Sequence, residues 1–155
     1  MSTININPHA ASTIVSPSTR ALLSVLAALN ERKFSKAVDQ FDDHFKFTDH
    51  ALGLEFIDKR RLIEFFHKSR ELFPDTVVET DDVCECGDHA TVEWKLRSTQ
   101  ILSFGPLQRR VSISLRGATI VHVENGRIRQ WSEYYDQLAS RRTSLAAFFT
   151  EWIEY

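Results

Sequence analysis

The sequence contains few of the residues that mark specialised folds. Among its 155 residues are two cysteines, one methionine, five glycines and four prolines. So few cysteines exclude a disulfide-dense domain, and so little glycine and proline excludes a collagen-like or low-complexity chain. Cys84 and Cys86 would share one face of a strand, which disfavours a bond between them, so we predict buried or half-buried free thiols. No second Cys or His pair has zinc spacing, so we predict no metal site and no cofactor.

The chain also lacks an excess of charge and any long apolar run. Its net charge of -2 and the absence of a Lys/Arg cluster argue against binding to nucleic acid or to a membrane surface. No apolar stretch is long enough to span a bilayer. The first residues lack the basic segment and continuous apolar run of a secretory signal. We therefore expect a cytoplasmic protein.

The residues that are present describe one globular domain. Hydrophobic residues make up 43% and charged residues 26%, and 11 Phe, three Trp and three Tyr can fill a core and line a cavity. Residues 1–17 are polar and rich in Ser, Thr and Asn, which predicts a flexible N-terminal arm. Residues 18–155 are predicted to form a single domain.

Apolar periodicity predicts helices in the first half of the chain. Ser18 or Thr19 can cap a helix, and a shorter helix around residues 34–41 follows. Asp58 is suited to cap a third helix that runs through Phe73 and ends before Pro74. A last helix is expected from about Gln137.

Alternating patterns predict strands in the second half. A short strand covers residues 45–49, and four longer ones are expected at residues 76–86, 89–102, 109–124 and 127–136. Helices followed by long antiparallel strands are typical of an α+β fold. A twisted sheet wrapped around the helices would form a half-open cone, whose inner face would enclose a ligand pocket.

The most informative segment is the hairpin of residues 116–136. Asn125-Gly126 lies between two strand patterns and predicts a type I′ turn, since that turn needs positive φ at both central residues. Trp131, Glu133 and Tyr135 then share one face, because side chains alternate along a strand. An acid between two aromatic residues is unusual in a plain core and indicates a pocket wall.

This hairpin carries a family resemblance. The segment VHVENGRIRQWSEYYD, together with HFKFTDHALG and the helix opening FIDKRRLIEFF, resembles the nuclear-transport-factor-2-like superfamily, in its SnoaL-like polyketide cyclase and limonene epoxide hydrolase branch. The resemblance covers roughly residues 19–145. It implies a cone-shaped, strongly curved mixed or antiparallel sheet wrapped around N-terminal helices.

The resemblance also implies catalytic positions. Glu133 stands where these cyclases carry a catalytic Asp and where the hydrolase carries one of its acids. The cyclases' His matches Thr119, so that His is absent. The hydrolase's Arg and second Asp match Trp94 and Leu96, so epoxide hydrolysis is not expected.

Three residues are candidate catalysts. Glu133 is expected to move a proton, because burial would raise its pKa towards neutrality. Asp49 or His50 is expected to assist, and alternation allows only one of them to point inward. The alternatives are an exposed Glu133 paired with Arg127 or Arg129, and an Asp49 that merely caps a turn.

The remaining predictions concern ligands and partners. Residues expected to contact substrate are Phe47, Phe66, Trp94, Thr119, Trp131 and Tyr135. The predicted function is a cofactor-free enzyme of specialised metabolism that cyclises, isomerises or rearranges a small apolar molecule. The alternative is a non-catalytic small-molecule-binding protein. The resemblance further implies a homodimer through the outer sheet face, which includes Ala118, Ile120 and His122.

Overall fold

The structure is a computed structural model that describes residues 15–136. Residues 1–14 of the arm predicted at residues 1–17 lie outside the described residues, as does the helix predicted from about Gln137. The helices are α1 (Pro17–Asn30), α2 (Phe34–Val38) and α3 (Lys59–Leu72). The strands are β1 (Phe41–Asp49), β2 (Leu54–Phe56), β3 (Val77–Cys86), β4 (His89–Phe104), β5 (Leu107–Glu124) and β6 (Arg127–Tyr135).

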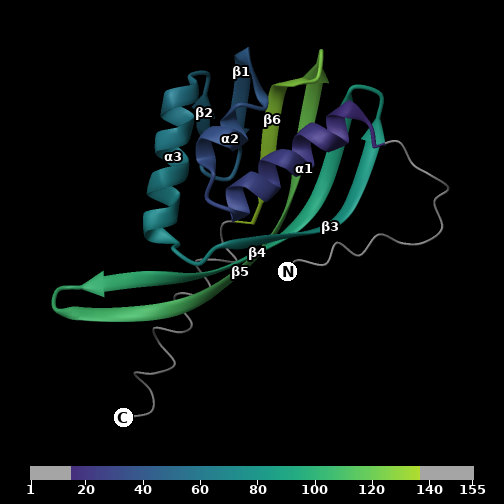
Figure 1. Ribbon diagram of the computed structural model, residues 1–155. Helices are drawn as coiled ribbons and strands as arrows, with labels where there is room; N and C mark the ends of the chain where they lie inside the picture. Colours follow the sequence, from purple (N-terminus) through teal and green to yellow (C-terminus); the bar gives the residue numbers. More distant parts are fainter. Residues whose placement is uncertain (1–14, 137–155) are drawn as a thin grey trace.

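The strands of this segment form one mixed sheet. Their order is β2-β1-β6-β5-β4-β3, with β1 parallel to β6 and every other neighbouring pair antiparallel. The helices lie on one face of the sheet, which curves around α1, and the end of the β4–β5 hairpin projects beyond the helices (Figure 1). The sheet does not close, since β2 and β3 form its edges. The predicted α+β cone is confirmed.

Two turns fix the register of the long strands. Asn125 and Gly126 have φ of 51° and 77°, as the type I′ prediction requires. The strands predicted at residues 89–102 and 109–124 extend further towards each other than predicted. Gly105 and Pro106 form a two-residue turn in which Gly105 has a φ of 61°, and pairing continues to Phe104 and Leu107. A glycine at the first turn position allows this, because it adopts positive φ without steric cost.

Helix α1 begins earlier than predicted. The Ser16 side chain accepts a hydrogen bond from the backbone N–H of Thr19 at 3.2 Å, and Pro17 occupies the first turn. Proline suits that position because its fixed φ is helical and its missing N–H is not needed there. Thr19 instead donates its hydroxyl to Glu85 on β3 at 2.6 Å.

The core fills the space between the helices and the inner sheet face. Its most completely buried large side chains are Leu22, Val25, Val38, Phe41, Phe47, Leu62, Val92, Val121, Ile128 and Trp131. Cys84 and Cys86 are free, as predicted, but the prediction that they are buried or half-buried was wrong: both are exposed, because β3 is an edge strand with little covering it. Within residues 15–136, no helix is long and apolar enough to cross a membrane.

A candidate acid and base site in an apolar cavity

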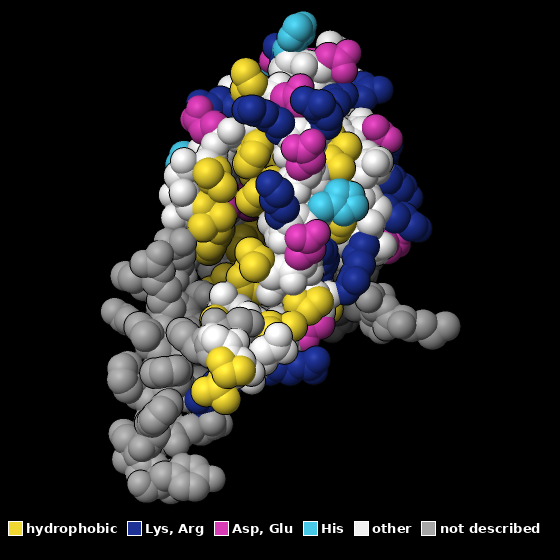
Figure 2. Space-filling view, turned by 90° about the vertical axis from the view of Figure 1, so that its left-hand side faces the viewer, with side chains coloured by type: hydrophobic (Ala, Val, Ile, Leu, Met, Phe, Trp, Pro, Cys, Tyr) yellow, Lys and Arg dark blue, Asp and Glu magenta, His cyan; other side chains and the backbone are white. Residues whose placement is uncertain are grey.

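A large cavity opens between the helices and the concave sheet face. Its volume is about 620 Å³, which is within the usual range for small-molecule sites. Figure 2 shows hydrophobic side chains gathered around a hollow on this side of the molecule. The lining residues are mainly apolar: Leu26, Leu29, Phe34, Leu52, Phe65, Phe66, Phe73, Val78, Trp94, Leu96, Leu102, Ile113 and Leu115. The cavity is therefore suited to a largely apolar ligand.

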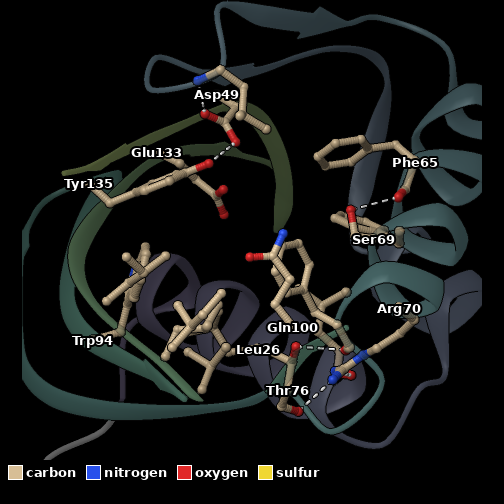
Figure 3. Close-up of a pocket in the computed structure, with 18 of the residues that line it drawn as sticks. Leu26, Asp49, Phe65, Ser69, Arg70, Thr76, Trp94, Gln100, Glu133 and Tyr135 are labelled. Atoms are coloured by element: carbon tan, nitrogen blue, oxygen red, sulfur yellow. Dashed lines mark hydrogen bonds between the residues drawn. The ribbon is translucent and has the colours of Figure 1, made fainter. Parts of the chain in front are cut away.

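Two carboxylates lie at one end of this cavity because β1 and β6 are parallel neighbours. Asp49 and Glu133 occupy paired positions in the register, so both side chains extend from the same face. Tyr135 follows two residues later on β6 and also faces the cavity. Figure 3 shows the three side chains grouped at this end.

Hydrogen bonds hold each of these groups in place. The Tyr135 hydroxyl donates to Asp49 Oδ2 at 2.9 Å, and the backbone N–H of Leu52 donates to Asp49 Oδ1 at 2.8 Å. Trp131 Nε1 donates to Glu133 Oε1 at 2.9 Å. Asp49 is only 2% exposed. Asp49 thus caps a turn, as one alternative held, and also faces the cavity.

The surroundings of Glu133 tune its protonation. Its pKa is raised from the ordinary value of 4.5 to about 7: burial is the largest cause, the Trp131 hydrogen bond partly offsets it by lowering the pKa, and the negative charge of Asp49 adds a smaller increase. The Glu133 side chain is half-buried, because one side of it borders the cavity. The protein that encloses the carboxyl group nevertheless withdraws it from bulk water. Glu133 can therefore both take up and release a proton near neutral pH.

Tyr135 is held in its neutral form. Burial raises its pKa first, and the charge and hydrogen bond of Asp49 raise it further. The Tyr135 proton consequently stays between the phenol and Asp49. Between Tyr135 and Glu133, Glu133 is therefore the group whose pKa lies near neutrality.

The opposite end of the cavity carries polar groups from α3 and the strands. Ser69, Arg70 and Thr76 lie there, away from Glu133, while the Gln100 side chain reaches into the middle of the cavity (Figure 3). Arg70 donates to the backbone carbonyl of Leu29 at 2.7 Å and to that of Thr76. Burial lowers its pKa, but a guanidinium stays protonated at neutral pH. This end can therefore receive a polar or anionic part of a ligand.

One wall of the cavity depends on a glycine. The indole N–H of Trp94 donates to Thr119 Oγ1 at 2.9 Å, and its ring lies across Gly117. A Cβ at residue 117 would come within 2.4 Å of Trp94 Cζ2 and 2.7 Å of the Tyr134 carbonyl oxygen. Only glycine therefore lets the Trp94 ring adopt this position.

The structure divides the predicted contact residues into two groups. Trp94, Tyr135 and Phe66 line the cavity, as do the predicted catalysts Glu133 and Asp49. The others lie behind its wall: Phe47, Thr119 and Trp131, none more than 1% exposed. Phe47 stacks on Trp131 with ring centroids 6.0 Å apart and an interplanar angle of 11°. This second group supports the wall from behind and is not among the residues that line the cavity.

His50 is not brought into the site. Its side chain is exposed and stacks on the Tyr134 ring with centroids 4.3 Å apart. Only its backbone N–H approaches the site, by donating to the Glu133 carbonyl at 3.0 Å. Since Asp49 points inward, alternation directs His50 outward. His50 is therefore withdrawn as a candidate catalyst.

The alternative pairing of Glu133 with an arginine is also excluded. Arg129 binds Asp42 at 2.8 Å and Glu124 at 3.4 Å. Arg127 donates to the backbone carbonyl of Asp39 at 2.9 Å. Both guanidinium groups are engaged elsewhere on the surface, while Glu133 faces the cavity.

Sequence reasoning missed Arg70 and Gln100. Gln100 continues the even-numbered inner face of β4 that begins with Val92 and Trp94, so the same alternation could have found it. Arg70 adjoins Ser69 on a helix whose neighbouring residues Phe66 and Phe73 are apolar. A charged residue next to the apolar face of this helix was the pattern that could have indicated Arg70.

Metal ligands are scarce among the residues that line this cavity. They offer the two carboxylates but no His or Cys. The group of metal-ligand side chains found within residues 15–136 is Asp88, His89 and His122, which lies outside the cavity lining.

Comparisons with known proteins agree with this fold. The family model for the SnoaL-like domain matches residues 22–131. No curated protein matches the chain. A proposed SnoaL-like polyketide cyclase from Shewanella denitrificans superposes with a TM-score of 0.73 at 14% identity, covering 83% of this chain and 97% of that one.

Two further structures share the architecture. IdmH from Streptomyces antibioticus, a proposed polyketide cyclase, gives a TM-score of 0.72 at 14% identity over 83% of this chain and 97% of its own. An LEH-like epoxide hydrolase from M. tuberculosis superposes with a TM-score of 0.67 at 16% identity. The match covers 90% of this chain and 97% of that one. At such identities the structures establish a common fold and no common activity. With the family model matching most of its length, the chain belongs to the SnoaL-like domain family.

Proposed function

We propose that this protein is a cofactor-independent enzyme that cyclises, isomerises or rearranges a small, largely apolar organic molecule by moving a proton. The observation that carries the proposal is Glu133, a carboxyl group with a pKa of about 7 that faces an apolar cavity. A base with a pKa near the working pH combines a large ionised fraction with adequate basicity. Membership of the SnoaL-like family supports a cyclase or isomerase class.

The proposed step uses Glu133 twice. Its carboxylate removes a proton from a carbon next to a carbonyl group of the substrate. In an isomerisation the proton returns to another atom of the same molecule; in a cyclisation the carbanion attacks a second carbonyl and the new alkoxide takes the proton. Neither course changes the net proton count. Asp49 and Tyr135 assist by position: the Asp49 charge helps to keep the pKa of Glu133 raised, and their hydrogen bond fixes this end of the cavity.

The rest of the cavity would bind and orient the substrate. Apolar walls such as Trp94 and Phe65 exclude water, which favours a productive geometry and protects a carbanion from bulk protons. At the opposite end of the cavity from Glu133, the Arg70 guanidinium would bind a carbonyl or carboxylate group of the substrate. Specialised metabolism supplies many molecules of this kind.

The test is proton exchange, because it needs no knowledge of the natural product. The purified protein would be mixed in D₂O with a panel of fused-ring and aryl alkyl ketones, and exchange beside the carbonyl would be followed by NMR. We expect the wild type to accelerate exchange of a member of the panel. Glu133→Gln should lower that rate by about 10²- to 10⁴-fold, the usual contribution of a general base.

The matched control is Glu93→Gln, which changes an exposed glutamate on the outer face of β4. It should leave exchange unchanged. Exchange that persists in Glu133→Gln would remove Glu133 from the proposed role.

A second candidate function is binding without chemistry. It is favoured by Thr119, Trp94 and Leu96, which stand where related enzymes are expected to carry catalytic His, Arg and Asp. Trp94 donates a hydrogen bond to Thr119, and Trp94 and Leu96 line the cavity, so all three positions serve the cavity wall. Ketones that bind without any exchange in the wild type would support this alternative.

We also propose a homodimer through the outer sheet face, in the cytoplasm. Ile120 and Tyr134 are 39% and 45% exposed on that face, and exposed apolar side chains favour pairing. Analytical ultracentrifugation should show two chains per particle. Ile120→Arg should shift that equilibrium to one chain, and a wild-type monomer at high concentration would contradict the proposal.

A further inference from the structure

We propose that Asp88, His89 and His122 form a binding site for a divalent transition-metal ion of the zinc type, separate from the cavity. Asp88 lies in the turn between β3 and β4, His89 is the first residue of β4, and His122 faces His89 across the β4–β5 ladder. One ligand atom from each side chain can be chosen so that all three lie within 4.8 Å of one another. None of the three lines the cavity.

The three side chains already converge on one point. Asp88 Oδ1 lies 2.6 Å from His89 Nδ1, and Asp88 Oδ2 lies 2.9 Å from His122 Nε2. The two imidazole rings stack with centroids 4.6 Å apart and an interplanar angle of 18°. A carboxylate between two aligned imidazole nitrogens is a ligand set that zinc prefers.

The backbone beneath the cluster is fixed from several sides. The N–H of Val123 donates to the Asp88 carbonyl at 2.9 Å, which ties the turn to β5. Gly87 has a φ of 60°, a conformation that suits the tight turn. The Ser18 hydroxyl approaches the Gly87 carbonyl at 3.4 Å, which brings the end of α1 against the same turn. The ligands therefore start from a held backbone, and only side-chain rotation is needed to close around an ion.

The distances leave room for that rotation. Zinc bonds of about 2.0–2.2 Å in a tetrahedron place ligand atoms roughly 3.4 Å apart, so a separation of up to 4.8 Å must shrink by up to about 1.4 Å, while the Asp88–His89 and Asp88–His122 distances of 2.6 Å and 2.9 Å must widen. The His89 and Asp88 side chains are 53% and 58% exposed and can move, and an ion can reach them from solvent. Glu124 Oε1 lies 3.8 Å from His122 Nε2 and can supply a fourth ligand in place of water.

The chemistry of the groups also fits. Each of the three side chains offers a ligand atom of a type that binds zinc: a carboxylate oxygen from Asp88 and a ring nitrogen from each of His89 and His122. Bound zinc would take the place of the protons that now lie between this carboxylate and the two rings. Each ring would keep a proton on its other nitrogen, as a neutral imidazole ligand does. The ion would fasten the β3–β4 turn to β5, and its role would be structural.

The experiment is calorimetric titration of the full chain with ZnCl₂ at pH 7.5. We expect one ion per chain. Loss of a residue that only supports a metal ligand weakens metal binding by about 10- to 100-fold. Removing a ligand itself, by His89→Asn or His122→Asn, should therefore weaken zinc binding by at least that factor. His44→Asn, which changes an exposed histidine on β1, is the matched control and should leave the affinity unchanged. MgCl₂ should give no heat of binding, since Mg²⁺ prefers oxygen ligands.

A second measurement guards against misfolded variants. Each protein would be melted with and without ZnCl₂, and only proteins with a cooperative transition would be compared. Zinc should raise the melting temperature of the wild type and of His44→Asn more than that of the ligand variants. Equal affinity in the wild type and in the His89→Asn/His122→Asn double variant would overturn the site. One ion per two chains would overturn it as well, because it would place the ion between molecules.

Discussion

The two ends of the cavity are built on different principles. At the sheet end, Glu133 has a raised pKa and lies beside the buried Asp49, so two acids share a poorly solvated space. At the helix end, Arg70 binds two backbone carbonyls, those of Leu29 and Thr76. The first arrangement costs stability at neutral pH and provides a reactive group. The second stabilises the fold and leaves a cation available for binding.

This difference separates chemistry from recognition. Functional groups that are poised for reaction are often held in surroundings that oppose their charged form. Binding groups can instead be preorganised by bonds that also serve the fold. If the comparison is right, removing the charged group should have opposite effects on stability at the two ends.

The largest expected effect is on the pH dependence of stability. Below about pH 4.5 Glu133 is protonated in both the folded and the unfolded chain, so it has no cost. As pH rises from about 4.5 towards the folded value of about 7, the unfolded chain loses the Glu133 proton before the folded chain does, so folding loses stability, and above about pH 7 the loss stays constant. The difference of pKa corresponds to about 3 kcal/mol at 1.36 kcal/mol per unit.

Glu133→Gln removes this penalty. Urea unfolding should show the variant more stable than the wild type at pH 8, by up to about 3 kcal/mol, with the gap closing towards pH 5. Glu93→Gln should show no such gap at either pH. If the difference in unfolding free energy between Glu133→Gln and the wild type were the same at pH 5 and pH 8, Glu133 would not destabilise the folded protein at neutral pH. The contrast between the two ends of the cavity would then be wrong.

The next effect belongs to the helix end. Arg70→Gln should destabilise the fold by about 1–3 kcal/mol, because the carbonyls of Leu29 and Thr76 lose a charged donor. The loss should be similar at pH 5 and pH 8, since the guanidinium does not titrate in that range. Arg61→Gln changes an exposed arginine on the same helix and provides the control for urea unfolding. An equal loss in both variants would show that Arg70 has no special structural part.

The smallest effects concern the neighbours of Glu133, and their signs are opposite. Asp49→Asn removes a charge that raises the pKa of Glu133, so that pKa should fall. Trp131→Phe removes the hydrogen bond that favours the carboxylate, so the pKa should rise above about 7. Both can be followed from the carboxyl carbon signal of Glu133 in NMR titrations. Shifts of the same sign would contradict the assignment of these two influences.

Much of the fold could be predicted because local rules control it. Asn125-Gly126 fixed a hairpin, and alternation along β6 identified Glu133 and Tyr135 as inner residues. Alternation gives the face of a residue but not its depth. Thr119, Trp131 and Phe47 are on the inner face as expected, yet they lie behind the cavity wall, since the curvature of the sheet sets where the core ends and the cavity begins.

The rest depended on contacts between distant segments. The pairing of Asp49 with Glu133 results from the parallel β1–β6 ladder, and no local pattern announces that ladder. The cluster at Asp88 depends on the cross-strand pairing of His89 with His122, which are far apart in sequence. The exposure of the cysteines follows from the position of β3 at the sheet edge.

The most direct test of the account is the titration of Glu133 itself in the wild-type protein. The chain would be labelled with ¹³C at glutamate carboxyl carbons, and the Glu133 signal would be assigned by its loss in Glu133→Gln. A midpoint near pH 7, well above the ordinary glutamate value of 4.5, is the predicted result. A Glu133 midpoint near 4.5 would show a carboxylate in contact with bulk water and would contradict the proposed acid and base site.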